Sequence, residues 1–451
     1  MKRLLSLMLA GVFAATLTQL PTASTAATSQ AHLSAQDASE IATSYDHLTT
    51  DFYKKVDPQS ILDGVRSELS STLKTAGSKG TVAALHSSDA PGANVRSIDL
   101  AVESAAHQTK VSTHDLSYAA IVGMMKSVND RYTVFMDPKE YAALNQGLDG
   151  SDFGGTGIVI QTDDQTKFIS VSNVVPGAPA DKAGIQQDDL ITAIDGTSTK
   201  GMSLDNASSH LRGKEGTKVT LSITRDGKAV TPVTITRAKI HQLSVYEKML
   251  PDKIGYVALT VFGRDTGAEL ATALDRLQQQ GARALIMDLR DNGGGYLEAA
   301  VAVSSKFISS GPVVSVESRA SNITTLEADD TAIPPIPLVV LVNGHTASAS
   351  EITSGAIQDS GVGEIIGTKT FGKGVVQTIY PLPDRSAVKI TTARYLTPHN
   401  RDINHLGITP DIVLDENKNP RFGDPAKDIQ LQRAVRYLDD RIARLNADNG
   451  V

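Results

Sequence analysis

Residues 338–352 read LVVLVNGHTASASEI, and this stretch decides the fold. Five apolar residues are followed directly by a polar turn and then by small residues that suit a helix. A short, continuous apolar run is typical of a strand buried on both faces of a parallel sheet. A hydroxyl at the start of the next helix, Ser348 or Ser350, would lie beside backbone N–H donors, a geometry that suits acyl transfer. Serine is also a preferred helix cap, so this segment alone leaves a purely structural role open.

Apolar strands and helices alternate on both sides of this segment, which predicts an α/β core. The pattern predicts strands at 254–259 and 284–289, helices at 266–279, 296–308 and 347–358, and a last amphipathic helix at 429–445.

A second junction follows the expected strand 284–289, where residues 288–295 read DLRDNGGG. Three glycines allow the backbone to approach a bound group closely and to point N–H groups at it. The Lys-Ser/Thr ending of a phosphate-binding loop is missing, and the dinucleotide-binding glycine pattern does not fit. A helix start that merely needs a tight turn has the same sequence, so this alternative stays open.

A serine nucleophile needs a base, and the sequence offers two candidates. His345 lies in the same loop as Ser348, which constrains its approach to the hydroxyl. Lys373 lies between glycines and apolar residues, where burial would lower its pKa and let it act as a base. A single lysine is more often a solvated surface charge, so residue type alone does not decide between them.

The composition changes near Asp149, and residues 149–238 have the pattern of a small β-rich domain. A glycine-rich turn at 153–157 runs into a strand, and PGAPADKAGI at 176–185 follows as the start of a short helix. This block resembles a PDZ domain, which binds an extended chain end as an added strand. The resemblance implies a substrate-binding turn made of Gly155, Thr156, Gly157 and Ile158.

The first 27 residues have the pattern of a secretory signal peptide. Lys2 and Arg3 precede an apolar run at 4–17, and small residues follow at 23–27. An uncleaved anchor is the alternative, because the run is only somewhat short of the about 17–25 residues that a span needs. The pattern predicts export to a bacterial periplasm, cell envelope or exterior.

Composition narrows the classes of function further. Lys and Arg total 43 against 50 Asp and Glu, for a net charge of −7, which argues against a nucleic-acid-binding surface. Hydrophobic residues make up 40% and charged residues 21%, which fits neither a disordered chain nor a multi-span membrane protein. The chain has no Cys, so a thiol nucleophile, a Cys-ligated metal and disulfides are excluded.

Together the motifs resemble the C-terminal processing peptidases, also called tail-specific proteases, which are serine peptidases with a PDZ domain. The likeness covers nearly all of the chain after the signal peptide. It rests on the glycine turn, TASASE at 346–351, FGKG at 371–374 with Gln377, DRYT at 130–133, TARYLTP at 392–398 and GITPDI at 407–412.

The resemblance implies a Ser–Lys dyad in which Ser348 is the nucleophile and Lys373 the general base. It implies that Gln377 orients the lysine amine. The oxyanion hole would consist of the amides of Ala349 and of a glycine in the 293–295 turn, which we assign to Gly294. No metal or organic cofactor is implied.

Regulation and partners also follow from the resemblance. The PDZ domain can swing over the catalytic tunnel in this family, so we expect Arg212 to touch the core when a substrate docks. The implied partners are protein substrates with exposed C-terminal tails and an adaptor lipoprotein. Two positions depart from the family pattern: His345, where a non-titrating residue is expected, and Asn400, where glycine is common but Asn tolerates positive φ.

The predicted fold class is α+β with several domains. The predicted parts are a signal peptide (1–27), a helical region (28–148), a PDZ-like domain (149–238), a crotonase- or ClpP-like α/β peptidase core (239–415) and a C-terminal linker and helix (416–451). Two alternative functions remain: a catalytically silent adaptor that binds chain ends, and a crotonase-like acyl-transfer enzyme. Export and the fused PDZ-like domain argue against a CoA substrate.

Overall fold

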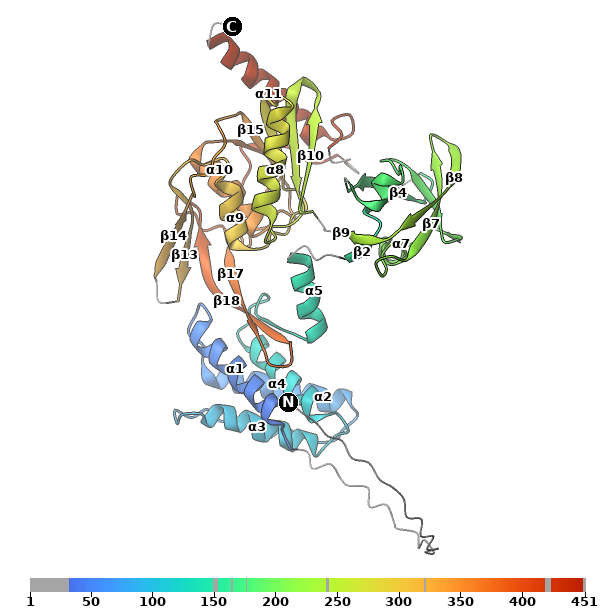
Figure 1. The fold of residues 1–451 in the computed structure, drawn as a ribbon. Coiled ribbons are helices and arrows are strands. Elements are labelled where there is room, and N and C mark those ends of the chain that lie inside the picture. Colours follow the sequence, from blue (N-terminus) through green and yellow to red (C-terminus); the bar gives the residue numbers. More distant parts are fainter. Residues whose placement is uncertain are drawn as a thin grey trace, which may run out of the picture.

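The computed structural model describes residues 32–148, 153–163, 165–175, 177–240, 243–319, 322–417 and 423–448. The predicted signal peptide at 1–27 lies outside the described residues. Within these ranges, no helix is long and apolar enough to cross a membrane. Figure 1 shows three parts: a helical bundle at the N-terminal end, a β-rich unit to one side, and a larger mixed part that ends in the last helix.

The bundle contains four helices: α1 (Ala35–Asp51), α2 (Pro58–Thr75), α3 (Ala93–Ala106) and α4 (Thr113–Ser127). Local sequence sets their starts, because Ser34, Asp57 and Ser112 each accept a hydrogen bond from a first-turn N–H. The sequence does not predict α3, whose buried side chains Ile98 and Val102 lie among small and polar residues. A hairpin tip from the mixed part supplies Leu382, Val388 and Ile390 to the same hydrophobic core.

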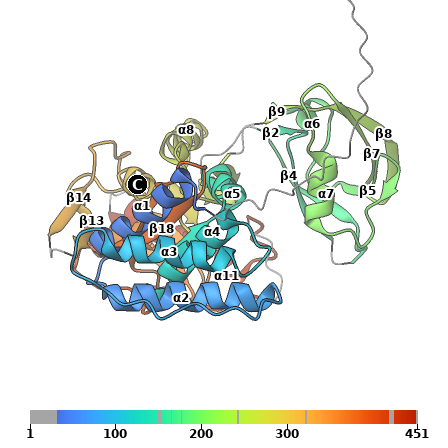
Figure 2. The same cartoon turned by 90° about the horizontal axis from the view of Figure 1, so that it is seen from below.

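The β-rich unit contains a sheet with the strand order β3-β4-β5-β7-β8, in which every pair is antiparallel. Its strands and helices are β3 (Ile158–Thr162), β4 (Ile169–Val174), α6 (Pro179–Lys182), β5 (Leu190–Ile194), β6 (Thr197–Ser198), α7 (Leu204–Leu211), β7 (Lys218–Arg225) and β8 (Lys228–Thr236). Two short strands, β2 (Phe153–Gly155) and β9 (Ala238–Ile240), pair where the chain enters and leaves. The unit stands beside the rest of the molecule in both views (Figures 1 and 2).

The mixed part is built on a six-stranded sheet with the order β10-β11-β12-β15-β16-β19, in which only β10 is antiparallel to its neighbour. The strands are β10 (Val245–Leu250), β11 (Ile254–Leu259), β12 (Ala284–Asp288), β15 (Leu338–Val342), β16 (Glu364–Gly367) and β19 (Ile412–Val413), with a 3-10 turn at Pro251–Lys253. The helices are α8 (Thr266–Gln279), α9 (Leu297–Ser304), α10 (Ala349–Ser360) and α11 (Ile429–Asp448).

The two faces of this sheet bury different helices. One hydrophobic cluster joins the sheet to α8, α9 and α10, and another joins the opposite face to α11. The predicted buried strands are confirmed, since every residue of β12 and β15 is buried. The α/β core predicted from the sequence is therefore confirmed, whereas a crotonase- or ClpP-like likeness stays a prediction.

A second sheet links this core to the bundle. Its path is β1-β18-β13-β14, with β17 paired to β18. It contains β1 (Val134–Met136), β13 (Pro312–Ser318), β14 (Ile323–Glu327), β17 (Val375–Pro381) and β18 (Ala387–Leu396), and α5 (Pro138–Leu148) follows β1. The β17–β18 hairpin reaches down to α1 and α4 (Figure 1).

Two predicted helix boundaries are wrong for local reasons. The helix predicted at 296–308 ends at Ser304, where short-range bonds from Phe307 and Ile308 to the Ser304 carbonyl close a turn. The helix predicted at 347–358 begins at Ala349, because the backbone of Ser348 has φ 58° and ψ −118° and is not helical.

Candidate active site

The two junctions singled out in the sequence lie side by side. Strands β12 and β15 are parallel neighbours, so their carboxyl ends meet at one edge of the sheet. The Thr346 hydroxyl donates to the Leu289 carbonyl at 2.8 Å, and the Ala347 N–H donates to the Asn292 carbonyl at 3.0 Å. The glycine turn is thereby bonded directly to the turn that precedes α10.

Ser348 occupies the N-cap of α10 with φ 58° and ψ −118°. A non-glycine residue in this region is strained, and such strain persists only where the surroundings impose it. The side chain is half-buried at the positive end of the helix dipole. Ser350, the alternative hydroxyl, is fully buried and donates to the Asn292 carbonyl at 3.0 Å, which is a structural role.

Gly294 lies against Ser348. A Cβ placed on Gly294 would be 2.7 Å from the Ala347 carbonyl oxygen and 2.8 Å from both the Ala349 nitrogen and the Ser348 Cβ. Its φ of 95° also favours glycine. The Gly294 N–H donates to Asn292 Oδ1 at 2.9 Å, whereas the Ala349 N–H, as the first in α10, has no acceptor within the helix.

Glu351 links the serine and lysine segments, although the motifs in the sequence predict no catalytic role for it. Its fully buried carboxylate accepts the backbone N–H of Ser348 and of Lys373, both at 2.9 Å. It also accepts the Thr370 hydroxyl at 2.5 Å and the Gly372 N–H at 2.7 Å. The signal in the sequence is the Ser-x-x-Glu capping pattern of 348–351.

Lys373 is half-buried just before β17, and its Nζ lies 5.1 Å from the centre of the Tyr132 ring. Burial, followed by the positive charge of Lys389, lowers the pKa of Lys373 to about 8. A buried Tyr395 hydroxyl donates to the Lys373 carbonyl at 2.6 Å and lies 3.2 Å from the Ser348 carbonyl. The two candidate catalytic residues therefore share both a carboxylate and a phenol.

Gln377 lies on β17, where its side-chain amide donates to the Val375 carbonyl at 3.3 Å. The register with β18 shifts between Val376 and Gln377. This bulge breaks the simple alternation of side chains on which the sequence spacing relied. The orienting role of Gln377 toward the lysine amine stays a prediction.

His345 is poorly placed to act as the general base. Its side chain is 81% exposed, and its Nδ1 faces Asp291 Oδ1 at 3.1 Å. Asn400 is the other position that departs from the family pattern. Its φ is 60°, so the predicted tolerance of positive φ is confirmed.

The predicted substrate-binding turn leads into β3, which is the edge strand of its sheet. Gly155 pairs with Ala238 in β2–β9, Thr156 is buried, and Gly157 has φ 81°. Ile158 opens β3 and is half-buried. An edge strand beside α7 is the kind of surface to which a peptide strand is added.

Arg212 is exposed at the C-cap of α7. The turn that follows is held by the buried Arg237, whose guanidinium donates to the carbonyls of His210, Leu211 and Lys218 at 2.7–3.1 Å. The backbone around Arg212 is thus fixed from inside the β-rich unit.

A strained serine at a helix N-terminus, adjacent amide donors and a half-buried lysine of lowered pKa are the features expected in the active site of a serine-type hydrolase. Residues 253–414 match the family model described as peptidase family S41, and residues 148–224 match that of the PDZ domain.

Two relatives cover most of this chain. A carboxyl-terminal-processing protease from Picosynechococcus sp. is 36% identical over 343 residues, which are 74% of this chain and 83% of the relative. A chloroplastic C-terminal processing peptidase from Tetradesmus obliquus is 37% identical over 321 residues, which are 67% and 69% of the two chains. A solved structure of a putative S41 protease from Bacteroides fragilis, 17% identical, shares the fold with a TM-score of 0.51 over 70% of this chain and 87% of that one.

The chain therefore belongs to peptidase family S41 and is a serine-type peptidase with a PDZ domain.

Proposed function

We propose that this peptidase cleaves protein substrates near their C-termini with a Ser348–Lys373 dyad, while its PDZ domain binds the substrate tail. The observation that carries the proposal is that the Glu351 carboxylate accepts hydrogen bonds from the backbone N–H groups of both Ser348 and Lys373. These two hydrogen bonds join the segment of the strained Ser348 to that of Lys373, whose pKa is about 8, through one carboxylate.

The proposed reaction begins with neutral Lys373, which accepts the proton of Ser348 Oγ. The oxygen attacks the scissile carbonyl, and the resulting ammonium then protonates the leaving amine. In the second half, Lys373 takes a proton from water, and the hydroxide attacks the acyl carbonyl. The bond to Ser348 Oγ then breaks, and the Lys373 ammonium returns its proton to that oxygen, which restores the neutral amine and the serine hydroxyl. Gln377 is proposed to orient the amine throughout.

The developing oxyanion is proposed to bind the N–H groups of Ala349 and Gly294. The Ala349 N–H heads a helix and has no intrahelical acceptor. The Gly294 N–H already donates to Asn292 Oδ1, so the substrate oxygen has to replace that carboxamide as acceptor. The close contact of Gly294 with Ser348 and Ala349 supports its place in this hole.

The substrate tail is proposed to add to β3 as a further antiparallel strand, with the side chain of its C-terminal residue beside Ile158. The Thr156 and Gly157 carbonyls accept bonds from the amides of Ala180 and Val175, which fixes the turn. The amides of the 155–157 turn are proposed to bind the terminal carboxylate.

The signal-peptide pattern of residues 1–27 supports export to a periplasm or cell envelope. An adaptor lipoprotein as a further partner stays a prediction of the resemblance. The adaptor alternative, a silent PDZ protein, is disfavoured because the serine and lysine of the dyad are both present.

The test is a mass measurement on a folded reporter domain that carries an apolar C-terminal tail. The wild type should shorten the reporter from its C-terminal end, and Ser348→Ala should leave it intact. The same tail with an amidated C-terminus should be cleaved more slowly, because the carboxylate is lost. Cleavage spread over internal sites, or equal cleavage by Ser348→Ala, would contradict the proposal.

A further inference from the structure

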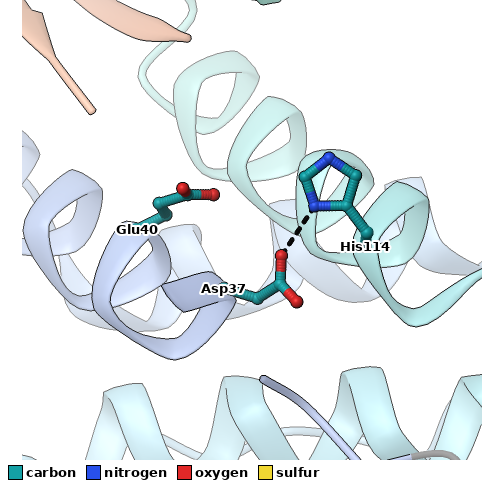
Figure 3. A group of neighbouring side chains, drawn as sticks. All are labelled: Asp37, Glu40 and His114. Carbon is teal, nitrogen blue, oxygen red and sulfur yellow. Dashed lines mark hydrogen bonds and ion pairs between the residues drawn. The ribbon is translucent and has the colours of Figure 1, made fainter. Parts of the chain in front are cut away.

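Three titratable side chains converge in the N-terminal bundle, far from the proposed dyad in the sequence. They are Asp37 and Glu40 on α1 and His114 on α4, here called the acid–histidine cluster (Figure 3). Each offers one potential ligand atom, and these atoms all lie within 4.8 Å of one another. Asp37 Oδ1 and His114 Nδ1 are 2.7 Å apart. The cluster therefore has the dimensions of a cation site.

Glu40 carries the independent observation. Its side chain is fully buried, and its Oε2 has no hydrogen-bond partner, while Oε1 accepts from Gln36 at 3.1 Å. Figure 3 shows this carboxylate turned toward the side where Asp37 and His114 meet. A buried carboxylate oxygen without a donor is costly, so it calls for a proton or a cation.

The surroundings are rich in negative charge. The carboxylates of Asp384 and Asp37 lie close enough to the buried Glu40 to act on it electrostatically. Asp384 comes from the turn between β17 and β18 and accepts the Tyr118 hydroxyl. Three carboxyl groups thus face one imidazole, which alone does not balance their charge.

We propose that the acid–histidine cluster binds a divalent transition-metal cation, and that Zn²⁺ is the cation its donors fit best. Two carboxylate oxygens and one imidazole nitrogen are a donor set that Zn²⁺ accepts, with water as the fourth ligand. Mg²⁺ and Ca²⁺ prefer oxygen ligands alone. The cation would replace the hydrogen bond between Asp37 and His114, whose imidazole must lose its proton to bind.

The position suggests a structural effect. Asp37 and Glu40 belong to α1 and His114 to α4, so one cation would cross-link two helices that also share an apolar core and the hydrogen bond from Ser117 to Asp37. It would lie beside Tyr118, which holds the hairpin turn at Asp384. Bound Zn²⁺ should therefore stabilise the bundle where it holds the β17–β18 hairpin.

The experiment uses the full chain after the signal peptide with Ser348→Ala, which prevents self-cleavage during the measurement. Titration with ZnCl₂ in a calorimeter should give one site per chain, and the thermal midpoint should rise by several degrees relative to EDTA. Binding should tighten as the pH rises, because protons compete for His114. Glu40→Gln and His114→Gln should each weaken Zn²⁺ binding at least about tenfold.

His47→Gln is the matched control. His47 faces Asp51 at 2.8 Å on the same helix α1, but it is not part of the acid–histidine cluster. This variant should bind Zn²⁺ as the parent does. His114 is partly exposed, so its variant should fold even if Glu40→Gln does not.

Two results would overturn the proposal. No Zn²⁺-dependent shift in the parent protein would mean that Glu40 is held protonated and that the cluster binds no cation. Equal loss of binding in His47→Gln and His114→Gln would mean that surface histidines bind Zn²⁺ without a defined site.

Discussion

Lys373 obtains its lowered pKa from its surroundings: burial first, then the positive charge of Lys389. Only the neutral amine can accept the serine proton, so kcat/KM should rise with pH through about 8 and fall about tenfold per pH unit below it. Removing the neighbouring charge should move this profile in a known direction.

Lys389→Met should raise the pKa of Lys373, shift the rise of the pH–rate profile to higher pH and lower kcat/KM at pH 7 several-fold. Lys389→Arg keeps the charge and serves as the control, with a profile close to that of the wild type. A profile in Lys389→Met that does not move would show that Lys389 has no part in tuning the lysine.

Gly294→Ala should disable the site without unfolding the protein. The added methyl would come within 2.8 Å of Ser348 Cβ and of the Ala349 nitrogen, and φ 95° is strained for alanine. Loss of one oxyanion donor alone costs about 100- to 1000-fold in kcat, so kcat should fall at least about 100-fold. Gly293→Ala is the control, since nothing lies within 4 Å of a Cβ there. Equal rates in both variants would remove Gly294 from the proposed hole.

At the same scale, the sequence predicted the candidate serine and lysine but not what holds them. Ser348 and Lys373 could be proposed because their motifs carry the resemblance. The grip of Glu351 could be read only as a helix cap, since its bonds to 370–373 depend on the fold. The bulge before Gln377 has no sequence signal, so the direction of that side chain could not be predicted.

At the scale of elements, buried ion pairs join α11 to the start of the glycine turn. The fully buried Arg290 lies between Asp288 and Asp428, at 2.6 Å from each, and donates to Gln430 at 3.1 Å. Asp288 ends β12, and Asp428 directly precedes α11. The arginine therefore joins the strand below the proposed oxyanion hole to the last helix.

Arg290→Met should lower the free energy of unfolding by about 3–5 kcal/mol, because it leaves two buried carboxylates without their positive counter-charge. Urea unfolding of the Ser348→Ala protein measures this loss. Arg276→Met removes the exposed pair with Glu247, 2.8 Å apart, and should cost less than about 1 kcal/mol. Similar losses in the two variants would mean that the buried network does not anchor α11.

Strongly periodic elements were predictable and others were not. Strands β12 and β15 could be predicted because both of their faces are buried, which makes them continuous apolar runs. Helix α8 could be predicted because one side of it is buried, which gives apolar residues at helical spacing. The sheet of β13, β14, β17 and β18 was not predicted, since its strands mix polar and apolar residues and pair across long separations. Its hairpin tip is buried only because the helical bundle covers it.

At the scale of the whole molecule, binding of a substrate tail to the PDZ domain has to be coupled to the Ser348–Lys373 dyad in the core. We expect Arg212 to contact the core when a tail is bound, because its planar, permanently charged group can grip a carboxylate or carbonyl in one domain arrangement only. Arg212→Ala should slow the hydrolysis of long tailed substrates several-fold and leave tail binding by the Ser348→Ala protein unchanged.

Deletion of residues 150–238 complements this variant. Higher activity of the shortened protein would mean that the PDZ domain mainly inhibits, and lower activity that it is needed for activation. Wild-type rates in Arg212→Ala would end the coupling hypothesis and leave the dyad untouched.

The central claim is that Ser348 is the nucleophile and Lys373 its base. Labelling with a fluorophosphonate probe, followed by peptide mapping, tests it most directly. We predict a single label on Ser348 in the wild type and in Ser350→Ala and His345→Ala, and none in Lys373→Ala at pH 8. A label on another serine, or labelling of Ser348 that persists in Lys373→Ala but is lost in His345→Ala, would contradict the dyad.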